Sequence, residues 1–594
     1  MTLFVPHTAG AVGVSLILED CNEQFCREVP FALTQQEGDY GHWQGSFTMD
    51  RGLYFYWFRI YKEGDAFRLF RQGNTTNMEQ GDKWQLSFLP EDFTVPDYAT
   101  GAVMYQILPD RFCKAGDYDL TGKLEPYTLH ADWYDLPRYG PDEEGHWNND
   151  FFGGNFRGIR EKLPYLKSLG VGVLYLNPIV MAFSSHRYDA ADYKRPDPML
   201  GTEEDFRLLC ETAHDLGIRV ILDGVFSHTG DHSLYFDSRG YFGAGAVSDP
   251  NSPYRSWYQF KDYPHDYEAW WGIKSLPCVN ELDPGFLDYI IEAEDSVVAY
   301  WMGLGADGFR LDVADELPDE FILRLKNRIR GIKADALLLG EVWEDASNKR
   351  AYGVSRRYFV DGELDSVMNY PWRKAILDFV QGTDDGTAFG ESVMTIAENY
   401  PPQVLHCLMN LLGSHDKPRI LTVLGDDFEG SKEEKAHRRL DPVQYARTRE
   451  KLYLAAFLQF TLPGMPSIYY GDEVGLEGFE DPWCRRTFPW GREDETLQTF
   501  FRALGELKNG EPTLRRGTVR ILEAGQGRLA YVRQTEEASA FVYVNRTGEE
   551  WSLPHGGELL FGRGLQCLGD KITLLPYGFC VIILFLDKMV DPFY

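Results

Sequence analysis

The stretch DGFRLDVADE, residues 307–316, decides the fold of this chain. Successive side chains of a β-strand point to opposite faces, so Arg310 and Asp312 would share one face while Phe309 and Leu311 fill the other. A buried strand that carries a fixed positive charge and a carboxylate on one face predicts a functional site at its end.

Seven other short apolar stretches flank this one and alternate with amphipathic helical stretches. The eight strand candidates are residues 102–108, 171–177, 219–225, 306–312, 336–342, 362–370, 406–414 and 464–470. Repeated βα units indicate a parallel sheet, and eight of them predict an α/β fold, the (β/α)8 barrel. Catalytic residues of such barrels lie at the C-terminal ends of the strands.

The patterns along the chain predict three domains. Residues 1–95 contain short alternating runs rich in aromatic residues, which predict an N-terminal β-sandwich whose aromatic residues form either core or a carbohydrate-binding face. Residues 96–510 would form the catalytic barrel, with an inserted loop domain at 229–282, far longer than the roughly 2–6 residues usual for such connections. Residues 511–594 return to alternating runs and predict a C-terminal β-domain.

The composition restricts the partners and the compartment. With 59 basic and 91 acidic residues the net charge is -32, which argues against nucleic acid and anionic membranes as partners. Nine cysteines without close pairs match neither a disulfide framework nor a zinc site. The N-terminus lacks a basic region, and no apolar run reaches the ~18 residues of a membrane span. We therefore expect a cytoplasmic protein.

Polar residues gather at the ends of the predicted strands. They are Asp223, His228, Arg310, Asp312, Glu341, His415 and Asp416. Any one acid would be explained as a helix cap, but capping gives no reason for an arginine and two histidines beside the acids. Glycoside hydrolysis needs two carboxyl groups, one ionised nucleophile and one protonated acid, about 5–5.5 Å apart in retaining enzymes. Arg310 would keep Asp312 ionised, while Glu341 would hold its proton near neutral pH.

Four ordered blocks carry a resemblance to a known family. They are DGVFSH (223–228), GFRLDVADE (308–316), GEVW (340–343) and LLGSHD (411–416). The chain resembles the α-amylase superfamily, glycoside hydrolase family 13, and within it the group of neopullulanases, cyclomaltodextrinases and maltogenic amylases. The stretches YQILPDRF (105–112), SSHRYDAADY (184–193), LPCVN (276–280) and GMPSIYYGDE (464–473) extend the resemblance over roughly residues 100 to 510.

The resemblance implies roles for three acids. Asp312 would be the nucleophile, Glu341 the acid/base, and Asp416 the third acid, which grips sugar hydroxyls and stabilises the transition state. It also implies a set of substrate-binding side chains: Tyr188, His228, Arg310, His415, Trp343, Glu316, Asp481 and Arg485.

These substrate-binding residues would have different tasks. The two histidines would hydrogen-bond the sugar at the cleavage position, Tyr188 would stack on its ring, and the Asp481–Arg485 pair would clamp the non-reducing end. Trp343 resembles an aromatic platform on the leaving-group side. Glu316 would hydrogen-bond sugar hydroxyls there and influence whether water or a second sugar attacks.

The chain departs from the family pattern at two positions. Ser227 stands where the family usually has Asn, which weakens the support of Asp223, and Asn155 stands where an acid is usual. A calcium site implied by the resemblance would find plausible oxygens only at Asp117, Asp119, Gly153 and Asn155. Because calcium takes six to eight oxygen ligands, we expect no metal and no cofactor.

The expected function is that of a retaining α-glucan hydrolase that cleaves α-1,4 and, as a second linkage, α-1,6 glucosidic bonds. Its substrates would be maltooligosaccharides, cyclodextrins, pullulan or starch. A transglycosylase or isomerase of the same superfamily stays open, since it shares the glycosyl-enzyme intermediate. A non-catalytic binding relative is a second alternative, although the chain keeps all three acids. The resemblance also implies a homodimer as one mode of assembly.

Overall fold

The computed structural model describes residues 1–20, 25–71, 81–554, 556–569 and 571–586. The contacts divide the chain into two compact units. One unit comprises Met1–Thr94, Ala346–Glu363 and Thr395–Pro402, and the other comprises Val95–Asp345, Leu364–Met394 and Gln403–Tyr594. The domain boundaries expected near residues 95 and 510 stay predictions.

The first unit is built on an antiparallel sheet. Its strands are β1 (Thr2–Pro6), β2 (Gly13–Asp20), β3 (Cys26–Glu37), β4 (Tyr40–Gln44), β5 (Gly52–Lys62), β6 (Asp65–Leu69) and β7 (Trp84–Phe88), in the order β1-β4-β3-β2-β5-β6 with β7 beside β5. The 3-10 helix η1 (His7–Ala9) lies between β1 and β2, and η2 (Asp97–Ala99) belongs to the second unit. Tyr54, Tyr56 and Trp84 are partly buried and pack against the hydrophobic core, so these aromatic residues contribute to the core.

Two later segments belong to this unit through polar contacts. Gln85 donates a hydrogen bond to the carbonyl oxygen of Asn399, and Asn348 donates one to Gln85. Arg71 forms an ion pair with Glu398 at 2.9 Å. The short strands β19 (Arg350–Ala351) and β20 (Val354–Ser355) form a hairpin in the first of these segments.

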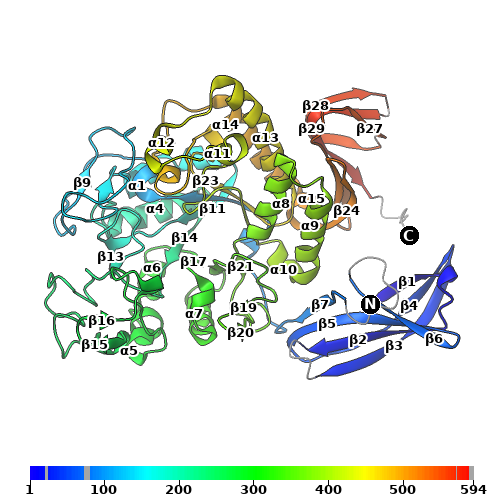
Figure 1. The fold of residues 1–594 in the computed structure, drawn as a ribbon, viewed down its shortest axis with the longest axis horizontal. Helices are drawn as coiled ribbons and strands as arrows, with labels where there is room; N and C mark the ends of the chain where they lie inside the picture. Colours follow the sequence, from blue (N-terminus) through cyan, green and yellow to red (C-terminus); the bar gives the residue numbers. More distant parts are fainter. Residues whose placement is uncertain (21–24, 72–80, 555, 570, 587–594) are drawn as a thin grey trace. The chain divides into compact units, whose positions relative to one another are not determined.

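The second unit contains a parallel eight-stranded barrel (Figure 1). Its strands in chain order are β8 (Val103–Ile107), β11 (Val171–Leu176), β14 (Arg219–Gly224), β17 (Gly308–Leu311), β18 (Leu337–Gly340), β21 (Ser366–Val367), β22 (Met409–Leu411) and β23 (Met465–Tyr469). A parallel bridge between Met368 and Met409 joins the two end strands of the sheet. Each strand lies inside its predicted range, which confirms the barrel.

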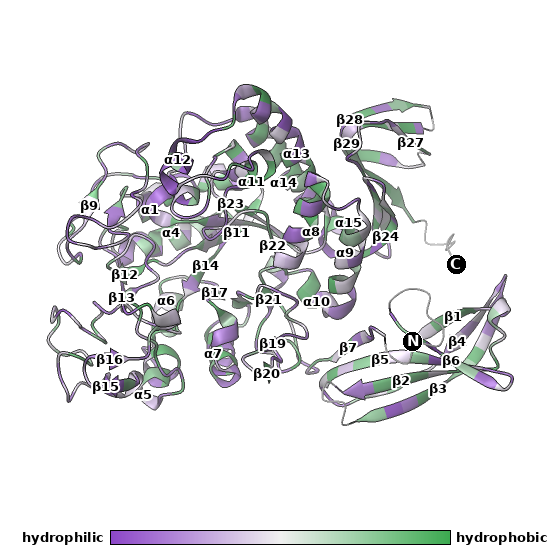
Figure 2. Cartoon of the chain, viewed as in Figure 1, coloured by the Kyte–Doolittle hydropathy of each residue, from purple (hydrophilic) through white to green (hydrophobic). Residues whose placement is uncertain are grey.

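Helices surround these strands. The helices of six or more residues are α2 (Phe156–Glu161), α3 (Leu163–Ser168), α4 (Glu203–Asp215), α6 (Val297–Gly303), α7 (Asp319–Ile332), α8 (Tyr370–Gln381), α9 (Thr387–Asn399), α11 (Ile420–Gly425), α12 (Lys432–His437), α13 (Pro442–Thr461) and α14 (Glu495–Gly510). In α7, Phe321, Leu325 and Ile329 are buried, and the helix is banded green and purple in Figure 2. This amphipathic pattern fixes which side of the helix faces the barrel.

Shorter elements connect these parts. They are α1 (Pro109–Phe112), α5 (Pro284–Leu287), α10 (Pro402–Leu405), α15 (Pro512–Arg516), β9 (Thr128–Leu129), β10 (Asp150–Phe151), β12 (Val180–Ala182), β13 (Ala190–Pro196), the π-helical turn η5 (Asp288–Glu292), and the 3-10 turns η6 (Ala314–Glu316), η7 (Asp472–Val474) and η8 (Trp483–Arg485).

The insertion after the third barrel strand folds around aromatic side chains. It contains η3 (Arg255–Trp257), β15 (Phe260–Asp262), β16 (Asp266–Tyr267) and η4 (Trp270–Gly272). Tyr235, Phe236 and Trp257 are buried, and the Tyr235 ring also stacks on Tyr193 of β13. The aromatic residues of the insertion therefore give it a core of its own, joined to the barrel.

The C-terminal residues of the second unit form another antiparallel sheet. Its strands are β24 (Thr518–Gly525), β25 (Arg528–Gln534), β26 (Ala538–Asn545), β27 (Trp551–Pro554), β28 (Glu558–Leu568) and β29 (Lys571–Phe585). Phe457 of α13 stacks on Phe579 of β29, and Arg533 of β25 donates to the carbonyl oxygen of Thr461. These contacts attach the sheet to a barrel helix.

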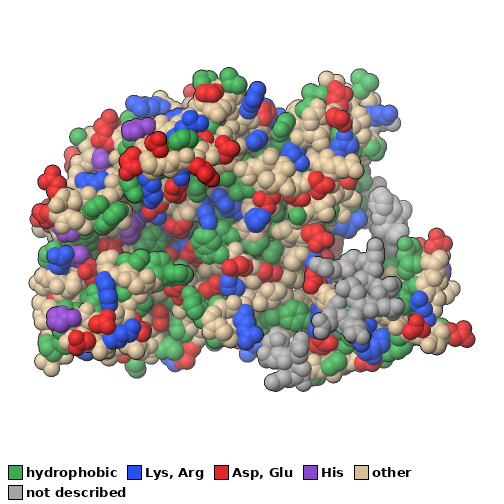
Figure 3. All heavy atoms as spheres, viewed as in Figure 1, with side chains coloured by type: hydrophobic (Ala, Val, Ile, Leu, Met, Phe, Trp, Pro, Cys, Tyr) green, Lys and Arg blue, Asp and Glu red, His purple; other side chains and the backbone are tan. Residues whose placement is uncertain are grey.

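Among the described residues, no helix is both long enough and apolar enough to cross a membrane. The cysteines that the structure describes are free thiols, and Cys21 lies outside the described residues. Acidic and basic side chains are interspersed on the face drawn in Figure 3.

Gly308, at the start of β17, offers a test of the barrel packing. A Cβ atom at this position would lie 2.0 Å from the carbonyl oxygen of Leu337, and the φ angle of 152° disfavours any L side chain. We expect Gly308→Ala to lower the free energy of unfolding by about 3 kcal/mol, as overpacking does, measured by urea denaturation. Gly331→Ala in α7 is the control, because nothing lies within 4 Å there and alanine favours the helix. Equal stability of the two variants would contradict the packing argument.

Candidate active site

Arg310 lies at the centre of a cluster of three carboxylates. Its Nη1 atom is 2.7 Å from Oδ1 of Asp223 and 2.8 Å from Oδ1 of Asp312, and its Nη2 atom is 2.7 Å from Oε2 of Glu341. The arginine side chain is fully buried. The structure therefore brings together the predicted nucleophile, the predicted acid/base and the predicted tuning residue around one guanidinium group.

The strand register produces this cluster. Arg310 of β17 pairs with Asp223 of β14 on one side and with Leu339 of β18 on the other. The strand ends at Leu311, and Val313 has a left-handed φ of 40°. A β-branched residue is strained in that conformation, and such strain concentrates at functional sites. The amide of Val313 donates to Oε2 of Glu341 at 3.0 Å, so this turn joins the two predicted catalytic acids.

The electrostatics of Asp312 differ from the expectation for the free protein. Burial raises the pKa of Asp312 well above its usual value, Arg310 acts to lower it, and Glu341 and Asp223 add to the increase. The expected lowering by Arg310 is present but does not prevail. Glu341 accepts hydrogen bonds from Val313 and Trp343 in addition to its ion pair with Arg310. One guanidinium cannot neutralise three carboxylates, so the cluster favours a bound proton.

Asp416 lies in the opposite electrostatic environment. Burial acts to raise its pKa, but His415 and Arg485 outweigh this effect and hold the pKa well below its usual range. Oδ2 of Asp416 is 3.0 Å from Nε2 of His415, and Oδ1 is 3.3 Å from Nη2 of Arg485. Arg485 also pairs with Asp481 at 3.1 Å. Asp416 is therefore ionised near neutral pH, and the predicted Asp481–Arg485 pair is assembled beside it.

Tyr188 connects Asp223 of the third barrel strand with His415, which follows the seventh. Its hydroxyl donates to Oδ2 of Asp223 at 2.7 Å and lies 2.6 Å from Nε2 of His415. The Tyr188 ring stacks on the His415 ring with centroids 5.2 Å apart. Tyr188 thus fixes His415, and its stacking on a sugar ring stays a prediction.

His228 is buried beside the insertion. Burial lowers the pKa of its imidazole to about 4, so it is neutral near pH 7. Nδ1 contacts Oγ of Ser227 at 3.0 Å, while Nε2 has no hydrogen-bond partner within the described part of the chain. Ser227 therefore orients the histidine, and Nε2 remains as a polar atom suited to a sugar hydroxyl.

Trp343 follows β18, two residues after Glu341. Its Nε1 atom donates to Oε1 of Glu341 at 3.2 Å, and its ring stacks on Tyr370 with centroids 4.5 Å apart. The ammonium group of Lys417 lies 3.7 Å from the Trp343 ring centroid. Trp343 thus orients the predicted acid/base directly, while its role as a sugar platform stays a prediction.

Comparisons with known proteins agree with this geometry. Residues 106–519 match the family described as alpha amylase, catalytic domain. The chain belongs to the α-amylase family.

Relatives within the α-amylase family carry several names. The chain is 37% identical over 562 residues to an amylopullulanase of Thermoanaerobacter thermohydrosulfuricus, covering 85% of this chain and 37% of that protein. It is 32% identical to neopullulanase 2 of Thermoactinomyces vulgaris, covering 87% of this chain and 83% of that protein. The chain spans less than half the length of the amylopullulanases that it matches.

A solved structure supports the fold over nearly the whole chain. The type III pullulan hydrolase from Thermococcus kodakarensis is similar with a TM-score of 0.70 and 26% identity, covering 98% of this chain and 96% of that chain. This likeness extends over the barrel and both terminal antiparallel sheets.

Glu316 has contacts that the sequence did not indicate. Its Oε2 atom accepts a hydrogen bond from Nε1 of Trp270 at 2.7 Å, and its Oε1 atom accepts one from Nε1 of Trp271 at 3.0 Å. The expected task of Glu316 was to bind sugar hydroxyls directly. The structure connects both of its oxygens to the insertion, and its binding of sugar hydroxyls stays a prediction.

Three further side chains of this α-amylase family site were missed in the sequence. Tyr175 donates to Oδ2 of Asp223 at 2.7 Å, Asn177 donates to the hydroxyl oxygen of Tyr188 at 2.9 Å, and Gln106 lies 2.9 Å from Nδ1 of His415. All three come from the first two barrel strands or the residue just after them. Their position at strand ends could have indicated them, but an uncharged polar residue there is a weaker indication of a functional site than a charged one.

The oxygens that a calcium site would use have other partners in the structure. Oδ1 of Asn155 already accepts from the amide of Gly158, and its Nδ2 donates to the carbonyl oxygens of Ala115 and Gly153. Asp117 pairs with Lys114 at 3.0 Å. An ammonium group and an amide occupied in helix capping replace the oxygens that calcium requires.

Asp119, the remaining predicted ligand, binds its own loop through Thr121. The described residues contain no cluster of three or more His, Cys, Asp or Glu side chains suited to a metal.

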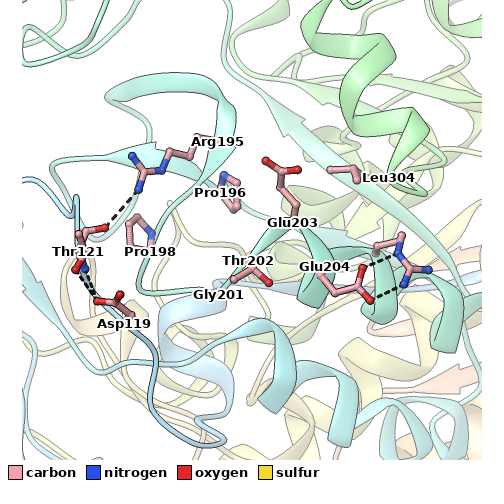
Figure 4. Close-up of a pocket in the computed structure, with 11 residues that line it drawn as sticks. Asp119, Thr121, Arg195, Pro196, Pro198, Gly201, Thr202, Glu203, Glu204 and Leu304 are labelled. Atoms are coloured by element: carbon pink, nitrogen blue, oxygen red, sulfur yellow. Dashed lines mark hydrogen bonds and ion pairs between the residues drawn. The ribbon is translucent and has the colours of Figure 1, made fainter. Parts of the chain in front are cut away.

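A separate hollow of about 510 Å³ lies at the start of α4 (Figure 4). Its lining residues are Asp119, Thr121, Arg195, Pro196, Pro198, Gly201, Thr202, Glu203, Glu204, Arg207 and Leu304. Its charged groups bind one another or the backbone, as in the contacts of Arg195 with Thr121 and of Arg207 with Glu204. None of the three predicted catalytic acids lines it, so this hollow is not the candidate active site.

Arg310 provides a test of the charge cluster. Arg310→Met leaves three buried carboxylates without their cation, which should cost about 3–5 kcal/mol of unfolding free energy at pH 8. In the variant the raised pKa of Asp312 rises further, so the folded state binds more protons than the unfolded state and stability falls as pH increases. The loss should therefore be smaller at pH 5, measured by denaturation at both values.

Arg310→Lys is the matched variant. It keeps the positive charge, but its single ammonium nitrogen cannot replace the two guanidinium nitrogens that contact the three acids. It should be intermediate in stability. If Arg310→Met lowers the free energy of unfolding equally at pH 5 and pH 8, the argument for a charge cluster would be wrong.

Proposed function

We propose that this chain is a glycoside hydrolase that cleaves α-glucosidic bonds with retention of configuration. The observation that carries the proposal is that one buried guanidinium contacts both Asp312 and Glu341, while Asp416 stands ionised at the end of the seventh barrel strand. Two carboxyl groups with different tasks are what glycosidic cleavage requires. The names of the relatives, which include amylopullulanase and neopullulanase, support an α-glucan as the substrate.

The proposed reaction has two steps. A carboxylate oxygen of Asp312 forms a bond to the anomeric carbon, while the glycosidic oxygen leaves with a proton from Glu341. The Glu341 carboxylate then accepts a proton from water, and the water oxygen replaces Asp312 at the anomeric carbon. Each step inverts the configuration at the anomeric carbon. The second inversion reverses the first, so the product keeps the configuration of the substrate.

The proton of the cluster must be on Glu341 when the substrate reacts. Glu341 accepts hydrogen bonds from Val313 and Trp343, whereas Asp312 accepts one from the Arg310 guanidinium. We infer that Glu341 carries this proton when the substrate is bound, because the glycosidic oxygen offers Glu341 an acceptor. Arg310 contacts both carboxylates and so stabilises Asp312 once it is ionised.

The remaining side chains support substrate binding. His228 offers Nε2 to a sugar hydroxyl. Asp416 and the Asp481–Arg485 pair, which follow the seventh and eighth barrel strands, offer charged acceptors and a charged donor. Charge-assisted hydrogen bonds of this kind contribute about 1.5–3 kcal/mol each. Hydrolysis of α-1,4 bonds, with α-1,6 as a second linkage, is the specificity that we propose. Cytoplasmic location and a homodimer are further parts of the proposal.

Asp312→Asn and Glu341→Gln test the catalytic roles. Wild-type protein incubated with pullulan, β-cyclodextrin and soluble starch should release oligosaccharides that chromatography separates. Asp312→Asn should lose turnover by about 10⁴-fold or more, because an amide cannot form the glycosyl ester. Glu341→Gln should lose less on a substrate with a good leaving group, which needs little protonation.

Both variants should keep the fold, so near-wild-type melting temperatures are the control. Turnover of maltotriose by either folded variant at a rate near that of the wild type would show that the roles are wrongly assigned.

The assembly is tested separately. Light scattering at micromolar concentration should give twice the chain mass. A monomer with full cyclodextrin activity would exclude the homodimer without affecting the catalytic proposal.

A further inference from the structure

Trp271 stands out on the insertion because it is a large apolar side chain that is 78% exposed. Its backbone is left-handed, with φ 48° and ψ 27°, and Gly272 follows with φ 79°. The amide of Ile273 donates to the carbonyl oxygen of Trp270, which closes a tight turn. Turns with two positive φ angles favour Asn-Gly, so tryptophan is an unfavourable choice for this position on structural grounds alone.

Glu316 holds this exposed indole in one orientation. One carboxylate binds the N–H groups of both Trp270 and Trp271. Trp270 in turn lies beside His228, with ring centroids 5.5 Å apart. The turn is thus tied to η6, which begins two residues after Asp312, and to the histidine whose Nε2 atom has no partner in the described part of the chain.

The position of the turn in the barrel is also informative. The insertion follows β14, and Glu316 follows β17, so both belong to the third and fourth strands. Asp416 follows β22, and Asp481 and Arg485 follow β23, which are the seventh and eighth strands. In the strand order of the closed barrel, β14 and β17 lie across from β22 and β23. The Trp271 turn and the Asp481–Arg485 pair therefore stand on opposite rims of the barrel mouth.

We propose that the exposed face of Trp271 is a stacking platform for a glucose ring of the substrate, on the rim opposite Asp481 and Arg485, and that Glu316 is its positioning residue. The inference rests on the proposed function and adds a second binding point for the glucan. Glucose rings present apolar C–H faces that pack on aromatic rings, and an indole held by a hydrogen bond loses little freedom on binding. The ligand class is an α-linked glucose oligomer long enough to extend past the cleavage position.

Binding to a catalytically inactive protein separates this role from chemistry. Maltoheptaose is titrated calorimetrically into Asp312→Asn and into the double variant with Trp271→Asn. Asparagine suits the turn better than tryptophan, so the double variant should keep or raise its melting temperature. Its affinity for maltoheptaose should fall by about tenfold, as for the loss of one well-packed aromatic contact.

Glu316→Gln in the same background tests the positioning role. Glutamine keeps one acceptor oxygen, so only one of the two indoles stays bound. We expect roughly a threefold loss of affinity. The change in tryptophan fluorescence on adding maltoheptaose should be reduced in this variant and smaller still in Trp271→Asn. Leu568→Ala, at an 84% exposed apolar side chain of β28, is the control and should bind like the parent.

The outcomes distinguish the two proposals. If Asp312→Asn still turns over glucans, or binds no maltoheptaose, the proposed function fails and this inference fails with it. If Asp312→Asn is inactive and binds, but Trp271→Asn leaves the affinity unchanged, only the platform is excluded. Unchanged affinity together with a lower mass by light scattering would assign Trp271 to a contact between subunits instead.

Discussion

The ion pairs of Arg310 are the constraint on which the rest of the site depends. Burying a guanidinium is costly unless carboxylates surround it, and here three carboxylates from three adjacent strands contact it. The pairing of β17 with β14 and β18 sets their places, so a shift in strand register would separate the charges. The barrel therefore positions these charges through its hydrogen-bond ladder, and the turn at Val313 completes the arrangement.

The sequence predicted the barrel well because parallel strands buried on both faces form apolar runs that few other structures produce. It was less accurate at strand ends. The sixth and seventh strands were predicted over residues 362–370 and 406–414 but span only Ser366–Val367 and Met409–Leu411. An apolar run shows that a segment is buried, whereas the length of a strand depends on how far its neighbours remain within hydrogen-bonding distance. That distance is a property of the closed barrel.

The candidate site shows the same division between local and tertiary information. Arg310, Asp312 and Glu341 were predicted because each stands at the end of a recognisable strand. The partners of Glu316 were not, because Trp270 and Trp271 precede it by more than forty residues and reach it only through the fold of the insertion. The same applies to Tyr188, a loop residue whose contacts with Asp223 and His415 join the ends of β14 and β22. A resemblance assigns a role to a position, but the acceptor that a side chain finds depends on its neighbours in space.

The charges around the site explain why aspartates on two strands behave differently. Asp312 shares one cation with two other carboxylates, so burial and repulsion raise its pKa. Asp416 lies beside a histidine and an arginine, which outweigh the effect of burial, and its pKa falls. Under the proposed function, a sugar between them would meet a side with a transferable proton and a side with fixed negative charge. The indole surface proposed for Trp271 would add apolar contact to the first side without adding charge. Because neutral contact area leaves the proton balance of the acid cluster unchanged, affinity for a long glucan can increase there independently of the chemistry at Asp312 and Glu341.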